Sequence, residues 1–166
     1  HGMEVTGGFV LGFDTDPPDI FDRQIRFVEE AAIPTAMVGL LTALPGTRLH
    51  KRLAAEGRLL DDSSGNNTHD LSVNFVTRMD ADVLLAGYKR VLAEVYRPRR
   101  YFRRSAELMR RLPPNTRPVQ GVSWTEVKAL LRSLILQGLS PYGGSYLRFL
   151  AGVALRRPRQ FPDAVA

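Results

Sequence analysis

The sequence predicts an α/β fold in which parallel strands are followed by a mainly α-helical extension. Two apolar runs, at residues 5–14 and 35–44, are each followed by a segment with helical spacing of its apolar residues. This strand–helix alternation within sixty residues is typical of a βαβα unit with parallel strands. From residue 80 onward the apolar residues recur at helical spacing only.

The first apolar run carries glycines and almost no polar residue, which is the pattern of a strand buried on both faces. After it, Asp16 is expected to cap a helix whose first position is Pro17. One face of this helix is apolar and is formed by Phe21, Ile25, Val28 and Ala32.

The second run ends at a Pro45–Gly46 turn, after which Thr47 caps a short helix that stops at Gly57. Two parallel strands do not complete a sheet, because a buried strand needs neighbours on both edges. We therefore expect that the fold begins upstream and that the chain is an excised fragment, since a strand follows His1 almost at once.

The remainder is predicted to be helical after a polar, turn-rich loop at residues 61–70 and a third strand or extended segment at 71–76. Asp80 caps a helix whose inner face is Leu84, Tyr88, Val91 and Val95. Pro98 breaks or restarts it, and the next stripe is Phe102, Ala106, Met109 and Leu112. A Pro-rich linker at 113–118 leads to a capping box of Ser123 and Glu126, and a last helix is expected at 145–155.

Composition limits the classes of function. Hydrophobic residues make up 44% and charged residues 24% of the 166, which is the balance of a globular protein. No apolar run reaches bilayer-spanning length and no signal peptide is evident, so we expect a cytoplasmic protein. The chain has no cysteine, which excludes disulfides, zinc–thiolate sites, cysteine-held iron–sulfur clusters and a cysteine nucleophile from this chain.

No catalytic set and no metal site stand out. The three histidines, His1, His50 and His69, do not occur at the i, i+4 spacing of a helical metal site. His69 precedes Asp70, so the two are either a base with its orienting carboxylate or two exposed loop residues. The second interpretation is favoured, because polar loops collect such residues without function.

Two further patterns have more than one interpretation. The glycines at 7, 8 and 12 indicate either a nucleotide site or, as their position within a strand favours, close packing of a strand, helix or ligand against the backbone. Seven arginines between residues 97 and 111 alternate with aromatic residues, and the net charge is +6. They form either a nucleic-acid surface or a solvated helix face whose aromatic residues lie in the core. A third interpretation is a face that docks on an acidic surface elsewhere in the protein. The solvated helix face is favoured, because the aromatic residue Phe102 lies on the apolar stripe of the helix.

The motifs at residues 8–14, 41–49 and 56–59 resemble the later half of a radical S-adenosylmethionine (SAM) barrel of the branch that contains a cobalamin-binding domain. The marks at 65–68, 74–75, 79, 87–88, 96–98 and 101–104 resemble the uncharacterised extension that follows this barrel. The resemblance therefore implies a partial (β/α) barrel with two or three parallel strands in residues 1–60, a loop and helical extension in 61–112, and a linker with a terminal helical hairpin in 113–166.

The resemblance implies that the parent protein uses SAM and a [4Fe–4S] cluster, with cobalamin in an N-terminal domain. The three-cysteine loop of that family is missing here, so we expect a non-catalytic fragment that by itself holds none of these cofactors. Its expected partners are the missing N-terminal part and a small-molecule substrate. The alternative function is a basic module that contacts nucleic acid or an acidic protein. A third interpretation is a structural interaction domain, whose strand edges, exposed by excision, pair between copies in a non-physiological dimer.

The resemblance also places individual residues. The expected cofactor-side residues lie along the first strand and at the end of the second: Gly8, Val10, Gly12, Asp14, Leu41, Ala43 and Leu44. The expected substrate-side residues are Asp16, Asn66, Asn67 and His69. No residue is expected to be catalytic or to bind a metal.

Overall fold

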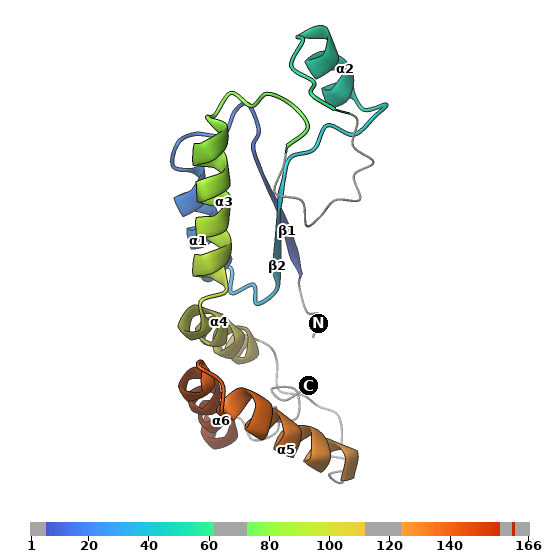
Figure 1. The fold of residues 1–166 in the computed structure, drawn as a ribbon. Coiled ribbons are helices and arrows are strands. Elements are labelled where there is room, and N and C mark those ends of the chain that lie inside the picture. Colours follow the sequence, from blue (N-terminus) through green and yellow to red (C-terminus); the bar gives the residue numbers. More distant parts are fainter. Residues whose placement is uncertain (1–5, 62–72, 112–123, 157–160, 162–166) are drawn as a thin grey trace. The chain divides into compact units, whose positions relative to one another are not determined.

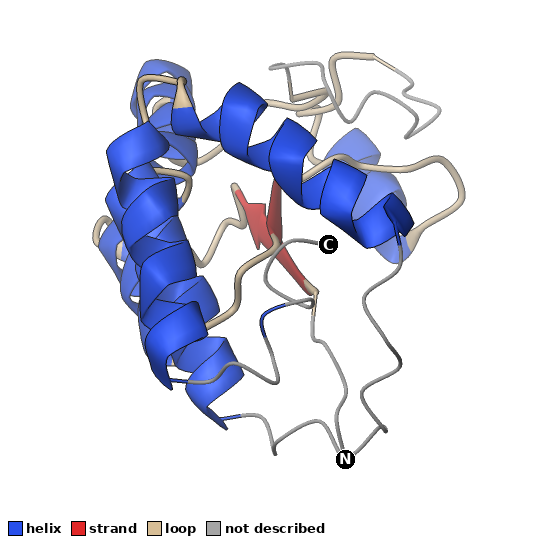
Figure 2. Cartoon of the chain, turned by 90° about the horizontal axis from the view of Figure 1, so that it is seen from below, coloured by secondary structure: helices blue, strands red, loops and turns tan. Residues whose placement is uncertain are grey.

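A computed structural model describes residues 6–61, 73–111, 124–156 and Phe161 (Figure 1). It confirms the predicted α/β class: two short parallel strands are accompanied by helices, which make up most of the described residues (Figure 2). In chain order the elements are β1 (Gly7–Leu11), α1 (Ile20–Glu30), β2 (Ala36–Leu40), α2 (Arg48–Ala55), α3 (Ala81–Val95), α4 (Pro98–Arg111), α5 (Trp124–Gly138) and α6 (Gly143–Arg156).

The chain forms two compact units. The first, which we call the sheet unit, comprises residues 6–28 and 35–95. The second, the helical unit, comprises residues 1–5, 29–34 and 96–166. Among the residues that the structure describes, no helix combines the length and the apolar character needed to cross a bilayer.

In the sheet unit, β1 and β2 pair in register from Gly7 opposite Ala36 to Leu11 opposite Leu40. Helices α1 and α3 lie on the same side of the two strands (Figure 1). On that side Leu11 and Ala36 are fully buried. The apolar faces predicted for the two helices are confirmed, since all of these residues are buried: Phe21, Ile25, Val28, Ala32, Leu84, Tyr88, Val91 and Val95.

The close approach of α1 and α3 depends on a glycine. A Cβ atom added at Gly87 of α3 would lie 2.2 Å from the ring of Phe21 of α1. No real side chain tolerates such a contact, so Gly87 gives Phe21 its place in the core. Tyr88, the next residue, donates its hydroxyl to the carbonyl oxygen of Val38 in β2, at 3.3 Å.

Three local predictions differ from the structure. Strand β1 is covered on one face only, because Gly8 and Val10 are exposed. Helix α1 begins at Ile20 rather than Pro17, because the Asp16 carboxylate accepts hydrogen bonds from the preceding loop instead of capping the helix. In the expected third strand, Phe75 forms an isolated antiparallel bridge with Leu59, and residues 71–72 lie outside the described part.

Other caps follow the prediction. The Thr47 hydroxyl accepts the amide of His50 at the start of α2, and Gly57 has the left-handed φ of 67° expected after that helix. The carboxylate of Asp80, the residue before α3, accepts the amides of Asp82 and Val83 in the first turn of that helix.

The helical unit is built from α4, α5 and α6. Phe102 of α4 lies against Tyr146 and Phe149 of α6, with ring centroids 5.8 and 5.5 Å apart. Ala106, which the apolar stripe predicted for α4 includes, is exposed. Arg104, which the stripe does not include, is almost completely buried. Leu112 and Ser123 lie outside the described residues.

Candidate functional site

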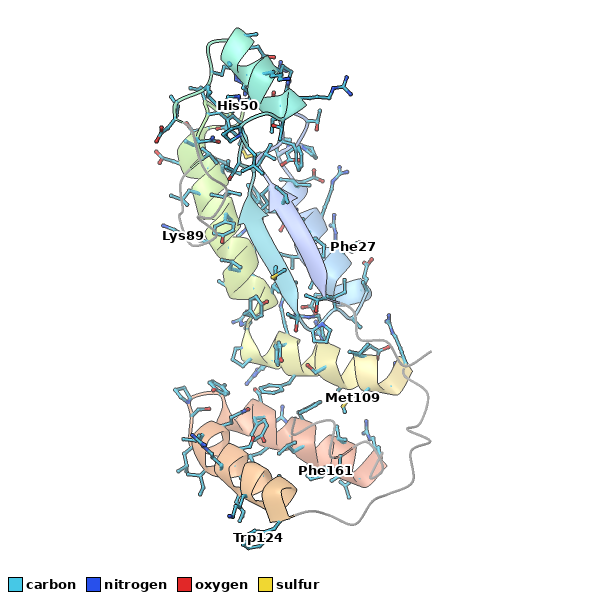
Figure 3. All side chains as sticks on the ribbon, turned by 90° about the vertical axis from the view of Figure 1, so that its right-hand side faces the viewer. Phe27, His50, Lys89, Met109, Trp124 and Phe161 are labelled. Atoms are coloured by element: carbon cyan, nitrogen blue, oxygen red, sulfur yellow. The ribbon has the colours of Figure 1, made fainter. Side chains whose placement is uncertain are left out.

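The sheet of the sheet unit has one open face, which we call the open face and define by Gly8, Val10, Met37 and Gly39. Gly8 pairs with Met37 and Val10 with Gly39, and paired residues of parallel strands point to the same side. Val10 is 43% and Met37 65% exposed, although both are apolar. Figure 3 looks onto the strands with α1 and α3 behind them. An apolar sheet face that is this exposed among the described residues is unusual, because parallel sheets normally bury both faces.

The open face has room for a ligand to reach the backbone. A Cβ atom added at Gly8 or at Gly39 would meet no heavy atom within 4 Å. The two glycines lie diagonally across the strand pair, Gly8 opposite Met37 and Gly39 opposite Val10, so each leaves space beside an apolar side chain. A flat group can approach the backbone at either glycine and lie against the neighbouring apolar side chain.

The loop after β1 is closed by a glycine and a carboxylate. Gly12 has a φ of 104°, and a Cβ atom there would lie 3.2 Å from Leu84 of α3, so glycine is required for two reasons. The Asp16 carboxylate accepts the amides of Gly12 at 2.8 Å and Phe13 at 3.0 Å. Asp16 therefore fixes the backbone at the carboxyl end of the strand.

Asp14 follows in the same loop and is held by arginines. Arg58 donates to both carboxylate oxygens of Asp14, at 2.9 and 2.6 Å, and Arg52 lies 3.1 Å away. Hydrogen bonds from Arg58, and the positive charge of the neighbouring arginines, hold the pKa of Asp14 below its ordinary value of 3.8. Asp14 is thus an ionised partner in a fixed ion pair.

Arg58 joins three segments at this end of the sheet. Besides Asp14, it donates from Nη1 to Glu56 at 2.9 Å and from Nε to the carbonyl oxygen of Val76 at 2.8 Å. The hydrogen bonds to the carboxylates of Asp14 and Glu56 raise the pKa of Arg58 above its ordinary value, so the guanidinium stays charged. It ties the loop after β1 to the end of α2 and to the segment before α3.

Asn74 completes the end of β2. Its amide group donates to the carbonyl oxygen of Ala43 at 3.0 Å and accepts the amide of Ala43 at 2.8 Å. It also donates to the carbonyl oxygen of Asp61 at 3.0 Å. One side chain thereby satisfies the backbone that a neighbouring strand would otherwise pair with.

The predicted cofactor-side residues fall into three groups. Gly8 and Val10 lie on the open face, and Gly12 and Asp14 lie in the loop after β1. At the end of β2, Ala43 is buried in a cluster with Leu53 and Phe75, against which Leu41 packs. Leu44 is 40% exposed, and its carbonyl oxygen accepts the Thr47 hydroxyl.

Of the predicted substrate-side residues, Asp16 lies in the loop after β1, as described above. Asn66, Asn67 and His69 lie outside the described residues.

Sequence reasoning did not assign Met37, Gly39, Arg58 or Asn74 to the site. The pairing of Gly39 and Met37 with β1 depends on register, which the sequence leaves open until both strand starts are known. Asn74 stands between Val73 and Phe75, and Arg58 directly precedes Leu59 and Leu60. That is the available signal, because a polar side chain in an apolar segment needs a buried partner.

The donor atoms of the chain fit some cofactors and not others. An iron–sulfur cluster needs thiolate ligands, and the whole sequence has no cysteine. Within the described ranges, no group of three His, Asp or Glu residues is placed to hold a metal ion. The open face, in contrast, offers apolar side chains and accessible backbone at its two glycines.

The predicted arginine cluster of α4 is largely paired within the helical unit. Arg103 and Arg104 form ion pairs with Glu29, and Arg104 also donates to the carbonyl oxygen of Ile33 at 3.0 Å. Arg110 and Arg111 form ion pairs with Glu107, and the hydrogen bond from Arg111 lowers the pKa of that glutamate. These arginines therefore hold elements of the unit together, which argues against the nucleic-acid interpretation.

Comparison with known proteins places the chain in a family. Residues 47–166 match a family described as a domain of unknown function, DUF4070, and the chain belongs to this family. The uncharacterized methyltransferase sll1242 of Synechocystis sp. is 38% identical over 104 residues, and the hopanoid C-2 methylase of Rhodopseudomonas palustris is 36% identical over 104 residues. Each match covers 63% of this chain and 19% of the relative. No solved structure matches the chain.

These matches confirm the resemblance seen in the sequence motifs, to the C-terminal part of cobalamin-branch radical SAM proteins with their uncharacterised extension. The chain spans about a fifth of the length of both relatives.

Proposed function

We propose that this chain is a non-catalytic C-terminal part of a radical SAM methylase, in which it forms one wall of the SAM site and part of the substrate cover. The observation that carries the proposal is the open face, an apolar sheet surface with two glycines on which Val10 and Met37 are exposed among the described residues. Support comes from the two relatives, one named a methyltransferase and the other a methylase, each about five times as long as the matched segment.

In this proposal the open face takes the adenosyl part of SAM. Gly8 and Gly39 let the adenine approach the backbone, and Val10 and Met37 exclude water from its edge. SAM and a [4Fe–4S] cluster together supply the radical chemistry of such an enzyme, and cobalamin adds the methyl-transferring step in its branch. The cluster ligands come from another part of the polypeptide, because this chain has no cysteine.

The loop after β1 has a positioning role. Asp16 holds the turn at Gly12, and the Asp14–Arg58 pair fixes it against the end of α2. Carboxyl ends of parallel strands meet at the mouth of a barrel, where chemistry is placed. In the same proposal residues 61–112 cover a small-molecule substrate, with Asn66, Asn67 and His69 as its proposed contacts. The division into 1–60, 61–112 and 113–166 belongs to the same proposal.

The test replaces the glycine of the open face in the full-length protein. Gly8→Leu fills the space above the backbone, and we expect the dissociation constant for SAM to rise by at least about tenfold. The matched control is Gly152→Leu in α6, where an added Cβ atom also meets nothing within 4 Å. Equilibrium dialysis with labelled SAM measures both. Equal affinity in the two variants would remove the open face from the SAM site.

A second measurement tests the non-catalytic role. The 166-residue chain alone is expected to bind SAM too weakly for calorimetry, since it lacks the cluster that takes part in holding SAM. Micromolar affinity of the isolated chain would contradict the proposal.

A further inference from the structure

Helix α5 of the helical unit presents an apolar outer face. Its exposed residues recur at positions 124, 128, 131, 132, 135 and 136, a spacing that places them on one side of the helix, and Leu139 follows directly after its end. The apolar members are large and strongly exposed: Trp124 (68%), Leu131 (52%), Ile135 (60%), Leu136 (63%) and Leu139 (85%). Figure 3 shows Trp124 on the side of the unit opposite to Met109 of α4. An apolar set of this size marks an interaction surface.

Helix α6 and the turn before it add to this surface. Tyr146, Leu150 and Val153 of α6 are buried, whereas Leu147 is 45% and Leu155 85% exposed. Tyr142, in the turn between the helices, is 40% exposed. We call the exposed apolar residues of α5, α6 and their turn the hairpin face.

After Glu126 in the first turn of α5, this part of the sequence carries basic residues and no acidic ones as far as Pro162. Residues 127–162 contain no aspartate and no glutamate, but six basic residues: Lys128, Arg132, Arg148, Arg156, Arg157 and Arg159. The four of these that the structure describes, at 128, 132, 148 and 156, are exposed. Lys128 lies next to Trp124, with its Nζ 5.7 Å from the ring centroid. Helix α4 differs, because its arginines pair with glutamates.

We propose that the hairpin face docks on a lipid bilayer surface that carries anionic headgroups. Leucine, isoleucine and tryptophan would enter the headgroup–acyl boundary, while the lysine and arginines contact lipid phosphates. Helix α5, with 15 residues, is about 22 Å long. It is too short to span the hydrocarbon core, so it would lie in the plane of the interface. This proposal does not depend on the proposed function.

Other occupants fit the surface less well. A nucleic acid would match the positive charge but leave Leu131, Ile135 and Leu139 in contact with phosphates and water. A second copy, paired through the same face around a two-fold axis, would bring the basic residues of both copies together. An anionic bilayer satisfies the apolar and the basic residues at once.

The experiment is vesicle flotation of the 166-residue chain. Vesicles of phosphatidylcholine and phosphatidylglycerol in equal amounts are expected to carry the chain, and vesicles of phosphatidylcholine alone much less. Lys128→Glu with Arg132→Glu should lower the partition coefficient on anionic vesicles by more than about tenfold. Ile135→Ser with Leu139→Ser should lower it by a similar factor, because it removes the inserted apolar groups.

Matched controls carry the same changes in the sheet unit. Arg26→Glu with Lys51→Glu alters the net charge equally, and Leu60→Ser with Val83→Ser removes two other exposed apolar side chains. Both are expected to bind vesicles as the unchanged chain does. All changed positions are exposed, and circular dichroism verifies the fold.

The proposal would be overturned if the unchanged chain did not float with anionic vesicles, or if the control variants lost as much vesicle binding as the test variants. It would also be overturned if the unchanged chain formed a dimer that did not bind vesicles and that dissociated in the Ile135→Ser, Leu139→Ser variant. Retention of an oligonucleotide that depends on Lys128 and Arg132 but not on Ile135 and Leu139 would assign the face to nucleic acid instead.

Discussion

The two faces of the β1–β2 sheet differ in what the chain itself supplies. On one face Leu11 and Ala36 are fully buried beneath α1 and α3. On the other, Val10 and Met37 are exposed, and Gly8 and Gly39 have empty space above them. Alternate residues of the same five-residue strands therefore have opposite environments, as the side-chain period of two requires.

The difference separates folding from function. Residues on the covered face hold the sheet unit together, and a change there is expected to act on stability first. Residues on the open face contribute less to the stability of this chain, because Val10 and Met37 are 43% and 65% exposed among the described residues. Their effect is expected to show only when a ligand or another part of the polypeptide covers them.

The largest expected effect is on the covered face. Leu11→Ala removes a fully buried side chain beneath the two helices and should lower the free energy of unfolding by about 3 kcal/mol. Urea denaturation of the 166-residue chain measures it. The matched control is Val10→Ala, the neighbouring residue on the open face, which should cost less than about 1 kcal/mol. Equal losses at the two positions would mean that the faces do not differ as described.

A smaller effect is expected at the ion pair where the sheet ends. Arg58→Met removes the donor of both hydrogen bonds to Asp14 and should cost about 2 kcal/mol at neutral pH. The control is Arg23→Met, which removes an exposed ion pair with Asp19 and should cost less than about 1 kcal/mol. A loss at Arg58 no larger than at Arg23 would leave the pair without a structural role.

The same pair has a pH signature. The pKa of Asp14 is lower in the folded chain than its ordinary value of 3.8, so its contribution to stability is complete above that pH. The contribution is lost as the pH falls below 3.8 and through the lower folded value, because the unfolded chain then binds the proton more readily. Urea denaturation at several pH values from neutral to acid should show a smaller decrease of the free energy of unfolding at low pH for Arg58→Met than for the unchanged chain. Parallel curves would show that the pair does not set the pKa of Asp14.

The sequence predicts best where a pattern is local. The inner faces of α1 and α3 follow from apolar residues at helical spacing, and the caps at Thr47 and Asp80 follow from side chains that accept nearby amides. The predicted start of α1 was wrong, because the Asp16 carboxylate accepts the amides of residues that precede it, Gly12 and Phe13, and not those of residues that follow it. Both uses of a carboxylate look the same in a sequence.

Long-range contacts are harder to predict. Arg104 occurs in an arginine-rich helix where exposure is expected, yet it is almost completely buried, because Glu29 and the carbonyl oxygen of Ile33 are both in reach. Asn74 pairs with Ala43 across 31 positions of the chain. In the candidate site, Gly8 and Val10 were predicted from the family resemblance, whereas Met37 and Gly39 required the register of β2.

The smallest expected change in the free energy of unfolding is at Met37 on the open face, and it tests most directly whether the two faces differ. Met37→Ser should change the free energy of unfolding of the 166-residue chain by no more than about 0.5 kcal/mol, because the side chain is 65% exposed. In the full-length protein the same change should cost more, since barrel strands and SAM would cover Met37 there. Parallel urea denaturation of the two proteins tests this, with exposed Val83→Ser as the control that should behave alike in both. A loss above about 1 kcal/mol in the isolated chain would mean that the open face is already packed within it, and the place proposed for SAM would then be lost.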